Sequence, residues 1–328
     1  MISRVWVSSL ALATVAFTGS TAPTAQVTPS TDGASRHVDR ARLMRDVATL
    51  AAPAFEGRQT GTPGALKARD WLVEQFEAIG LESGETEGYV QSFTVRAPEL
   101  SGATADGRAP AREHTGANVI GHVTGRVARG RMLVVTAHYD HLGIRNGVVY
   151  PGADDNASGV AVLLAAARHF SQAPPRHTIL FAALDAEERG LQGARALLSS
   201  TLISPATVVV DVNLDMVGRS DSNDIYAAGT SYTPWLRPML DDVQTRAAVR
   251  IRFGHDQPLG PSGLEDWTHS SDHGPFHDAG IPFVYFGVED HHDYHTASDT
   301  PDRIDRRFFG DAADMIVETL RTLDAGLE

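Results

Sequence analysis

The stretch MLVVTAHYDHLG, residues 132–143, is the part of the sequence that best predicts the fold and the candidate site of this chain. Its first half, Met132–Ala137, is a short apolar run typical of a strand buried on both faces of a sheet. Its second half places His138 and Asp140 directly after that strand, two residues apart and therefore on the same side. A carboxylate beside a histidine fixes the ring orientation in metal sites, although a histidine at a strand end is also an ordinary structural feature. The stretch thus predicts a sheet protein and a first candidate ligand.

Similar apolar runs recur along the chain, with helical patterns between them. Strands are expected at residues 93–95, 118–123, 132–137, 178–184, 208–214 and 282–286. Helices are expected at residues 38–50, 65–79, 160–170, 191–199, 235–246 and 306–323. Because strands alternate with helices, the sequence predicts an α/β fold with three layers, helix/sheet/helix, around a mixed, mostly parallel central sheet.

Composition restricts the classes of function. The 328 residues carry a formal net charge of -13, and phosphate binding needs clustered Lys and Arg, so nucleic acid is not an expected partner. Hydrophobic residues make up 42% of the chain and charged residues 21%, which is ordinary for a globular protein. The chain has no cysteine, so thiolate metal sites are excluded and any zinc must be held by His, Asp and Glu.

The first residues have the pattern of a secretory signal. Arg4 forms the basic part, Val5–Phe17 the apolar part, and small residues follow up to Ala25. The apolar run is shorter than the roughly 20 residues of a membrane span, so no membrane anchor is expected. We therefore expect a signal peptide at residues 1–25, a flexible leader at 26–36, a single domain at 37–328, and export to the periplasm or the medium.

Four further motifs contain metal-competent side chains. They are PGADDNASG at 151–159, LDAEERGLQGA at 184–194, VNLDMVG at 212–218 and DYHTASDTPD at 293–302. Each has an ordinary explanation, because acids cap helices and polar residues form turns. A carboxylate such as Asp215, placed between Leu214 and Met216, is less easily explained, because a buried charge needs a partner.

The motifs are more informative together than singly. Every one of them follows the carboxyl end of an expected buried strand, which is the edge of an α/β sheet where ligands bind. Histidine and carboxylate donors suit zinc, and cobalt or manganese can use the same donors. The sequence therefore predicts a metal site at this edge.

These residues resemble the zinc aminopeptidases of the bacterial leucyl aminopeptidase and aminopeptidase Y type, whose fold relatives include glutamate carboxypeptidase and glutaminyl cyclase. The resemblance runs from AAPAFEGRQTGTPG at 51–64 to DYHTASDT at 293–300. It implies two zinc ions per chain. One would be held by His138 and Asp215, the other by Glu188 and His295, and Asp155 would bridge both.

The resemblance also implies an activity and further roles. The expected activity is removal of the amino-terminal residue from a peptide with a free amino terminus, by a water shared between the two ions. Glu187 would be the general acid/base and Asp140 would orient His138, so these two are the expected catalytic residues. The Asp155–Asn156 peptide bond is expected to be cis.

Some features depart from this family or leave alternatives open. Larger relatives insert a protease-associated domain, and residues 98–114 leave no room for one. Some relatives place an aromatic hydroxyl near the substrate in the corresponding segment. This chain has Trp267, Thr268 and His269 there, so the residue that would stabilise the oxyanion is left open.

Three other functions fit parts of the pattern. A carboxypeptidase or dipeptidase on the same fold would need an Arg for the substrate carboxylate, and Arg219 and Arg145 are candidates. A single-zinc glutaminyl cyclase-like transferase would leave the His138 position empty. A non-catalytic binding ectodomain would be expected to have lost a ligand or Glu187, and none is lost.

Overall fold

The computed structural model describes residues 37–84, 88–96, 114–127, 130–257 and 264–327. The chain divides into two units, residues 1–34 and residues 35–328, and the fold below is that of the second. The signal peptide and leader predicted for residues 1–36 lie outside the described residues. None of the helices in the described ranges is both long and apolar enough to span a membrane.

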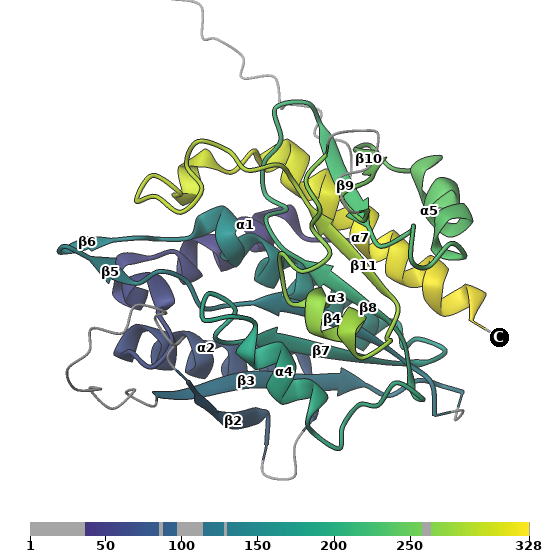
Figure 1. The fold of residues 1–328 in the computed structure, drawn as a ribbon, viewed down its shortest axis with the longest axis horizontal. Coiled ribbons are helices and arrows are strands. Elements are labelled where there is room, and N and C mark those ends of the chain that lie inside the picture. The colour runs from purple at the N-terminus through teal and green to yellow at the C-terminus, as the bar shows by residue number, and fades with distance from the viewer. Residues whose placement is uncertain (1–36, 85–87, 97–113, 128–129, 258–263, 328) are drawn as a thin grey trace, which may run out of the picture. The chain divides into compact units, whose positions relative to one another are not determined.

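A large mixed sheet forms the centre of this unit (Figure 1). In the described residues it has nine strands, with spatial order β1-β3-β7-β4-β8-β11-β9-β10, and β2 pairs with β3 beside that path. Their bounds are β1 Glu82–Ser83, β2 Val90–Val95, β3 His114–Val123, β4 Met132–His138, β7 Thr178–Leu184, β8 Val208–Leu214, β9 Asp224–Ala228, β10 Arg250–Phe253 and β11 Phe283–Gly287. A separate hairpin joins β5 Ile144–Arg145 to β6 Val148–Val149.

The sheet is parallel in its middle, antiparallel on the β3 side and between β11 and β9, and parallel again between β9 and the edge strand β10. Neighbouring strands in the order β7, β4, β8, β11 are parallel, with Val134 of β4 opposite Leu180 on one side and Asp211 on the other. The β3 to β7, β2 to β3, β1 to β3 and β11 to β9 pairings are antiparallel. The predicted mixed sheet is confirmed, and its parallel part consists of the strands that carry the candidate ligands.

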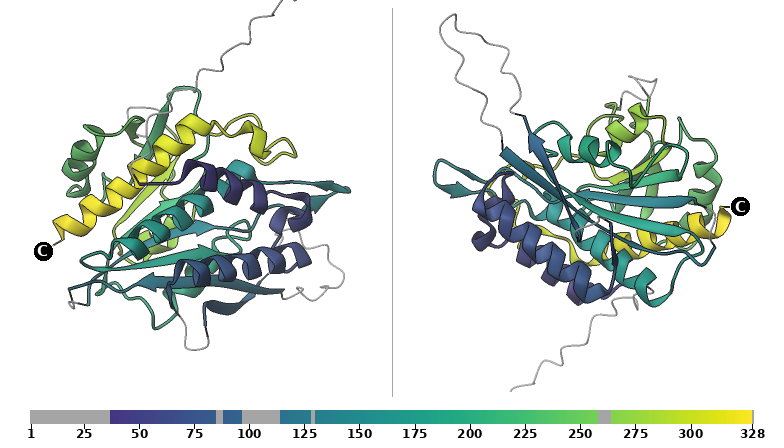
Figure 2. Two further views of the ribbon diagram at one scale, coloured as in Figure 1. Left: turned by 180° about the vertical axis from the view of Figure 1, so that it is seen from behind. Right: turned by 90° about the horizontal axis from the view of Figure 1, so that it is seen from below.

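Helices cover both faces and give the predicted three layers. One face is covered by α1 Arg40–Leu50, α2 Pro63–Ile79, α3 Gly159–Gln172 and α7 Arg306–Gly326, as Figure 2 shows from behind. The other face is covered by α4 Gln192–Leu198 and α6 His273–Asp278. The remaining helix, α5 Leu236–Gln244, packs against α7 and β10.

Alternation within the central strands explains this layering. In β4, Leu133, Val135 and Ala137 belong to the core on the α3 side, whereas Val134 belongs to the core under α4 and α6. Side chains of a strand alternate between its two faces, so a strand that is apolar throughout is buried on both. This is why continuous apolar runs, rather than alternating ones, mark the strands that lead to the site.

Local signals place the helix ends. Asp39 accepts a hydrogen bond from the amide of Arg42 at the start of α1, and Asp305 does the same for Arg307 and Phe308 at the start of α7. Gly80 ends α2 in the left-handed conformation at φ 80°. The helix expected at 306–323 is α7, and the apolar residues on one side of it are buried, as core packing requires.

Candidate metal centre

The candidate ligands all lie at the carboxyl edge of the parallel strands. His138 is the last residue of β4, and Asp215 directly follows β8. Glu188 lies in the loop after β7 and His295 in the loop after β11, while Asp155 belongs to the irregular helix η2, Ala153–Ser158, that precedes α3. All five line one cavity of about 450 Å³. The topology therefore collects residues that are far apart in the sequence.

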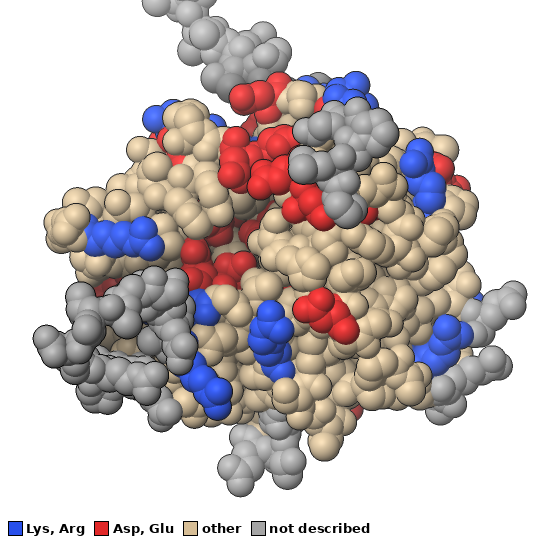
Figure 3. Space-filling model, viewed as in Figure 1, with Lys and Arg blue, Asp and Glu red and all other residues tan. Residues whose placement is uncertain are grey.

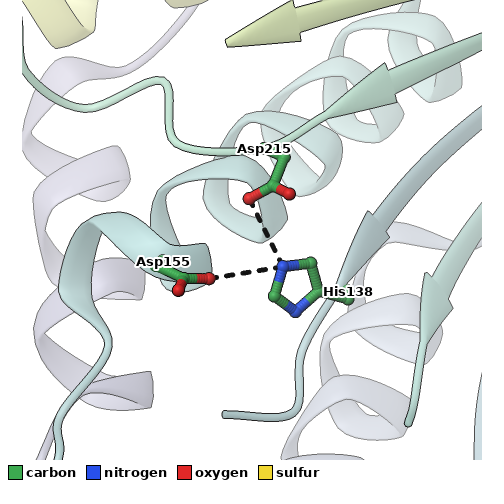
Figure 4. A group of neighbouring side chains, drawn as sticks. All are labelled: His138, Asp155 and Asp215. Atoms are coloured by element: carbon green, nitrogen blue, oxygen red, sulfur yellow. Dashed lines mark hydrogen bonds and ion pairs between the residues drawn. The ribbon is translucent and has the colours of Figure 1, made fainter. Parts of the chain in front are cut away.

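A first group of donors surrounds His138 (Figure 4). Its Nε2 atom lies 3.3 Å from Oδ1 of Asp215 and 3.4 Å from Oδ1 of Asp155. His138 is 1% exposed and Asp155 3%, so these atoms are withdrawn from solvent. Ligands at about 2.0 to 2.1 Å from a tetrahedral zinc ion lie about 3.3 to 3.5 Å from one another, and this group matches that spacing.

A second group surrounds Glu188 and uses the other oxygen of Asp155. Nε2 of His295 lies 3.1 Å from Oδ2 of Asp155 and 3.4 Å from Oε1 of Glu188. Because Oδ1 of Asp155 faces the first group and Oδ2 the second, this carboxylate lies between two sets of donors. The Asp155–Asn156 peptide bond is cis, as the resemblance implied.

His141 lies beside the same two carboxylates and forms a candidate donor group with Asp155 and Glu188, although no sequence pattern singled it out. Its Nδ1 atom lies 3.0 Å from Oε1 of Glu188 and 3.6 Å from Oδ2 of Asp155. The only sequence signal was its place in the quoted stretch, three positions after His138. Strand alternation gave no reason to expect its side chain at the site, because β4 ends at His138.

Asp140 contacts the site through its backbone and its carboxylate. Its carbonyl oxygen lies 3.2 Å from Nδ1 of His138, and its Oδ1 atom lies 3.7 Å from the same nitrogen. Oδ1 also accepts a 3.0 Å hydrogen bond from the amide of Glu187, and Oδ2 accepts one of 3.1 Å from the hydroxyl of Thr60. The backbone carbonyl is thus the nearer partner of the imidazole, while the carboxylate also holds the glutamate loop.

Further hydrogen bonds hold the η2 loop that presents Asp155. The carboxylate of Asp299 accepts hydrogen bonds from the amides of Asp154 and Asp155 at 2.9 to 3.0 Å. The amide nitrogen of the Asn156 side chain donates to the carbonyl of Leu214 at 2.9 Å, which joins this loop to the end of β8. Asp154 points away from the donors and accepts a 2.7 Å hydrogen bond from the amide of Gly218. Of the adjacent pair, Asp155 alone faces both groups.

Arg58, from the GRQTGTPG stretch, is a buried support of the same loops. It is 0% exposed, and its guanidinium donates to the carbonyl oxygens of Leu50, Tyr139, Pro151 and Gly152 at 2.6 to 2.8 Å. Tyr139 lies between His138 and Asp140, and Gly152 precedes η2. Burial lowers the pKa of Arg58 to about 10, so it stays charged at neutral pH. The arginine therefore ties two ligand-bearing loops to α1.

The two adjacent glutamates have different environments. Burial raises the pKa of Glu188, but the imidazoles of His141 and His295 outweigh that effect and bring it to about 2. Burial raises the pKa of Glu187 well above its ordinary value, and His138 opposes the rise while Asp215 adds to it. Glu187 lines the cavity and belongs to neither donor group. A bound dication would favour its charged form.

Unpartnered polar atoms test whether these residues fit metal ions. Oε1 of Glu188 and both ring nitrogens of His141 are buried without a hydrogen-bond partner. Buried polar atoms are normally paired, and ions satisfy those that protein groups do not. Histidine nitrogens and carboxylate oxygens are the donors that zinc accepts. The donor chemistry, the spacing and the unpaired atoms therefore all fit zinc.

The mouth of the cavity is acidic. Glu265, Glu289 and Asp290 join the candidate ligands in its lining, and Figure 3 shows acidic side chains gathered around a hollow in this face. The aromatic residues Trp267, Tyr285 and Tyr294 complete much of the wall. Within the described residues that line the cavity, none is Lys or Arg.

Trp267, Thr268 and His269, which depart from the pattern of the family, lie in different places. Trp267 lines the cavity, whereas the hydroxyl of Thr268 donates to Asp266 at 2.5 Å and the ring of His269 pairs with Asp278 at 3.0 Å. Tyr285, on β11, lines the cavity with its hydroxyl 3.5 Å from the carbonyl oxygen of Asp215. A phenol is thus present near the donors, supplied by a strand rather than by the expected loop.

A mixed sheet whose carboxyl edge carries two adjoining groups of histidines and carboxylates defines an α/β protein with a candidate two-metal centre. The chain belongs to peptidase family M28, whose model matches residues 118–320. Aminopeptidase YwaD of Bacillus subtilis is 33% identical over 199 residues, which cover 56% of this chain and 39% of that protein. A probable zinc metalloprotease of Pyrenophora teres f. teres is 29% identical over 214 residues, which cover 61% of this chain and 41% of that protein.

Solved structures share the fold. An aminopeptidase from Aneurinibacillus sp. strain AM-1 superposes with a TM-score of 0.69 at 18% identity, covering 87% of this chain and 94% of that one. LapB from Legionella pneumophila superposes with a TM-score of 0.66 at 21% identity, covering 88% and 72%. At these identities the likeness establishes the fold. The chain spans about two fifths of the length of each of these two curated relatives, YwaD and the Pyrenophora protein.

Proposed function

We propose that the protein is a zinc-dependent aminopeptidase with two zinc ions per chain. The first ion would be held by His138 and Asp215 and the second by Glu188 and His295, and Asp155 would contribute one oxygen to each. The observation that carries the proposal is the position of Asp155, whose two oxygens face separate donor groups in one cavity that Glu187 also lines.

The expected chemistry divides between the ions and the chain. Two zinc ions would supply Lewis acidity, which lowers the pKa of water and polarises the scissile carbonyl, and cobalt or manganese could replace them. Glu187 takes a proton from the attacking water and hands it to the leaving amine. Asp140 positions this glutamate through the 3.0 Å bond to its amide and contacts His138 at the same time.

The charge of the cavity favours an amino terminus over a carboxyl terminus. A carboxypeptidase needs a cation for the substrate carboxylate, but Arg219 is paired with Asp293 at 2.7 Å and Arg145 lies near the ring of Tyr150. Neither lines the described part of the cavity. Glu265, Glu289 and Asp290 instead make its mouth attractive to an ammonium group.

The transferase alternative receives less support. A single-zinc glutaminyl cyclase would not need His138 as a ligand, yet His138 lies within 3.4 Å of two carboxylates. The relatives YwaD and the Aneurinibacillus protein are themselves named aminopeptidases. These observations favour hydrolysis of peptides with a free amino terminus.

The test compares free and blocked substrates with and without metal. We expect hydrolysis of leucine p-nitroanilide to be lost with a chelator and restored by zinc, and N-acetyl-leucine p-nitroanilide to resist hydrolysis. Activity that persists in metal-free protein contradicts the metal mechanism. Equal hydrolysis of the blocked substrate, or hydrolysis of a peptide with a blocked amino terminus from its carboxyl end, contradicts the aminopeptidase.

Export is part of the same proposal, because residues 1–25 have the pattern of a signal peptide. Expression with the native amino terminus, followed by sequencing of the mature protein, tests it. An amino terminus near residue 23 or 26 in the periplasm or medium supports export, whereas an uncleaved protein in the cytoplasm contradicts it.

A further inference from the structure

We propose that the second zinc ion has four protein ligands, with His141 as the fourth beside Asp155, Glu188 and His295. The inference rests on the proposed two-metal centre and assigns it an additional ligand. It also makes the two sites unequal, because the first group, His138, Asp155 and Asp215, has three protein ligands.

Distances place the Nδ1 atom of His141 where a ligand of this ion belongs. It lies 3.0 Å from Oε1 of Glu188 and 3.6 Å from Oδ2 of Asp155. His295 makes the matching distances of 3.4 and 3.1 Å to the same two oxygens. These four separations run from 3.0 to 3.6 Å, and donors on one zinc ion are expected to lie about 3.3 to 3.5 Å apart. The rings of His141 and His295 are 5.9 Å apart at 60°, so they approach from different sides.

The relative orientation of the His141 and Glu188 side chains also indicates a metal ion between them. His141 Nδ1 and Glu188 Oε1 are close enough for a hydrogen bond, yet neither atom has a hydrogen-bond partner. A hydrogen bond requires the N–H to point at the acceptor. Two polar atoms that are close, buried and not aligned with each other are placed to meet a third atom between them. A histidine that only packed in the core would be expected to pair at least one nitrogen.

The backbone holds this ring in place. The amide of His141 donates to the carbonyl of Arg58 at 3.3 Å, so its main chain is tied to the arginine that supports the ligand loops. The ring lies against Gly152, where an added Cβ would come within 2.6 Å of two ring atoms. Gly152 has φ 57°, a conformation that favours glycine. The side chain of His141 is 0% exposed. The imidazole is therefore fixed before any ion binds.

Unequal ligand numbers predict unequal behaviour. Zinc sites with four protein ligands are typically closed and structural, whereas catalytic sites keep a position open for water or substrate. The second site should therefore bind zinc more tightly and fill first. The first site, around His138, should retain the open position.

X-ray absorption of zinc counts bound imidazoles and needs no activity measurement. With one equivalent of zinc added to metal-free wild-type protein, we expect two imidazoles per ion, and in His141→Ala we expect one. A competing chelator should show the tighter of the two affinities falling by about tenfold or more in His141→Ala. His177→Ala is the matched control, because His177 is equally buried but pairs with Asp324.

The possible results separate this inference from the proposed function. One imidazole per ion in the wild-type protein at both one and two equivalents overturns the role of His141. The wild-type measurement decides this even if His141→Ala fails to fold. Equal zinc affinities in wild-type protein and His141→Ala also overturn it. A wild-type protein that takes up no zinc overturns the two-metal proposal itself.

Discussion

The amide of Glu187 donates a 3.0 Å hydrogen bond to Oδ1 of Asp140, so one aspartate contacts both the proposed acid/base and the imidazole of His138. The two segments come from neighbouring parallel strands, β7 and β4. A change at Asp140 should therefore affect the position of Glu187 as well as that of the metal ligand.

We predict that Asp140→Asn lowers kcat by about 10- to 100-fold and weakens zinc binding. The asparagine side chain keeps the size of the aspartate but removes its charge. When its NH2 group faces the backbone N–H of Glu187, two donors meet and the hydrogen bond is lost. Steady-state kinetics and zinc analysis check this. Thr60→Val is the control, because it removes the hydroxyl that contacts Oδ2 of Asp140 and Oδ1 of Asp185 and leaves the bond from the Glu187 amide intact. Wild-type kcat in Asp140→Asn would show that the aspartate does not position the site.

The neighbouring glutamates should respond differently to the same change. Glu187→Gln cannot accept a proton, so kcat should fall by about 10²- to 10⁴-fold while zinc content stays near two per chain. Glu188→Gln loses a charged ligand, so zinc content should fall together with stability. Metal analysis beside kcat separates them. The roles are assigned the wrong way round if Glu187→Gln loses metal and Glu188→Gln keeps both ions.

The acidic mouth should contribute to substrate binding. Asp290→Asn combined with Glu289→Gln should raise KM for leucine p-nitroanilide more than it lowers kcat, because these acids line the cavity outside the two donor groups. Added salt should diminish the difference from wild-type protein, since screening weakens exposed charges. Asp70→Asn, at an exposed position on α2, is the control. An unchanged KM in the double variant contradicts an electrostatic role for the mouth.

Arg58 should be essential for stability. Arg58→Met leaves four carbonyl oxygens without their donor, so we expect the free energy of unfolding to fall by about 3 kcal/mol or more. Urea denaturation of metal-free protein measures it. Arg307→Met, on the exposed side of α7, should change stability by less than about 0.5 kcal/mol. A similarly small loss in Arg58→Met would show that the loops hold together without the arginine.

His273 should make the protein sensitive to mild acid. Burial lowers its pKa from 6.5 to about 3, so below pH 6.5 the unfolded chain binds a proton that the folded protein does not. The free energy of unfolding should then fall by up to about 1.4 kcal/mol per pH unit, until about pH 3. Above pH 6.5 this group adds no pH dependence.

His273→Phe tests this origin, because it keeps a ring 4.7 Å from the rings of Phe283 and Tyr285 but cannot titrate. Urea denaturation of metal-free protein between pH 5 and pH 7 should show a flatter profile for the variant. His277→Phe, later on the same helix and partly exposed, is the control. Parallel profiles for wild-type protein and His273→Phe would assign the acid sensitivity to other groups.

The sequence was most informative where burial was complete. β4, β7 and β8 are buried on both faces and mostly apolar, so their residues alone located them, although β8 also carries the buried Asp211 and Asn213. β9 and β10 were not anticipated. β10 alternates between exposed Arg and buried Ile, and a four-residue edge strand gives little pattern. The helix α6 was missed because HGPFHD is too short to show helical periodicity and contains a Pro.

The candidate site likewise contains residues that the sequence could place and residues that it could not. Residues at strand ends, such as His138 and Asp215, could be placed by counting along a strand. His141 and Arg58 could not, because their roles depend on loops that meet in space and on carbonyl groups that every residue possesses. The acids Glu265, Glu289 and Asp290 likewise reach the cavity through loop packing, which no local pattern encodes.

The loop at residues 288–300, which follows β11, carries both His295 and the rim acids Glu289 and Asp290. Zinc binding by His295 should therefore also fix the position of Glu289 and Asp290, and a peptide held by these two acids should also fix His295. By thermodynamic reciprocity, the factor by which zinc raises affinity for a peptide equals the factor by which the peptide raises affinity for zinc. A saturating, slowly cleaved peptide should therefore protect the protein from chelators, and the resting enzyme should be the form most easily stripped of its metal.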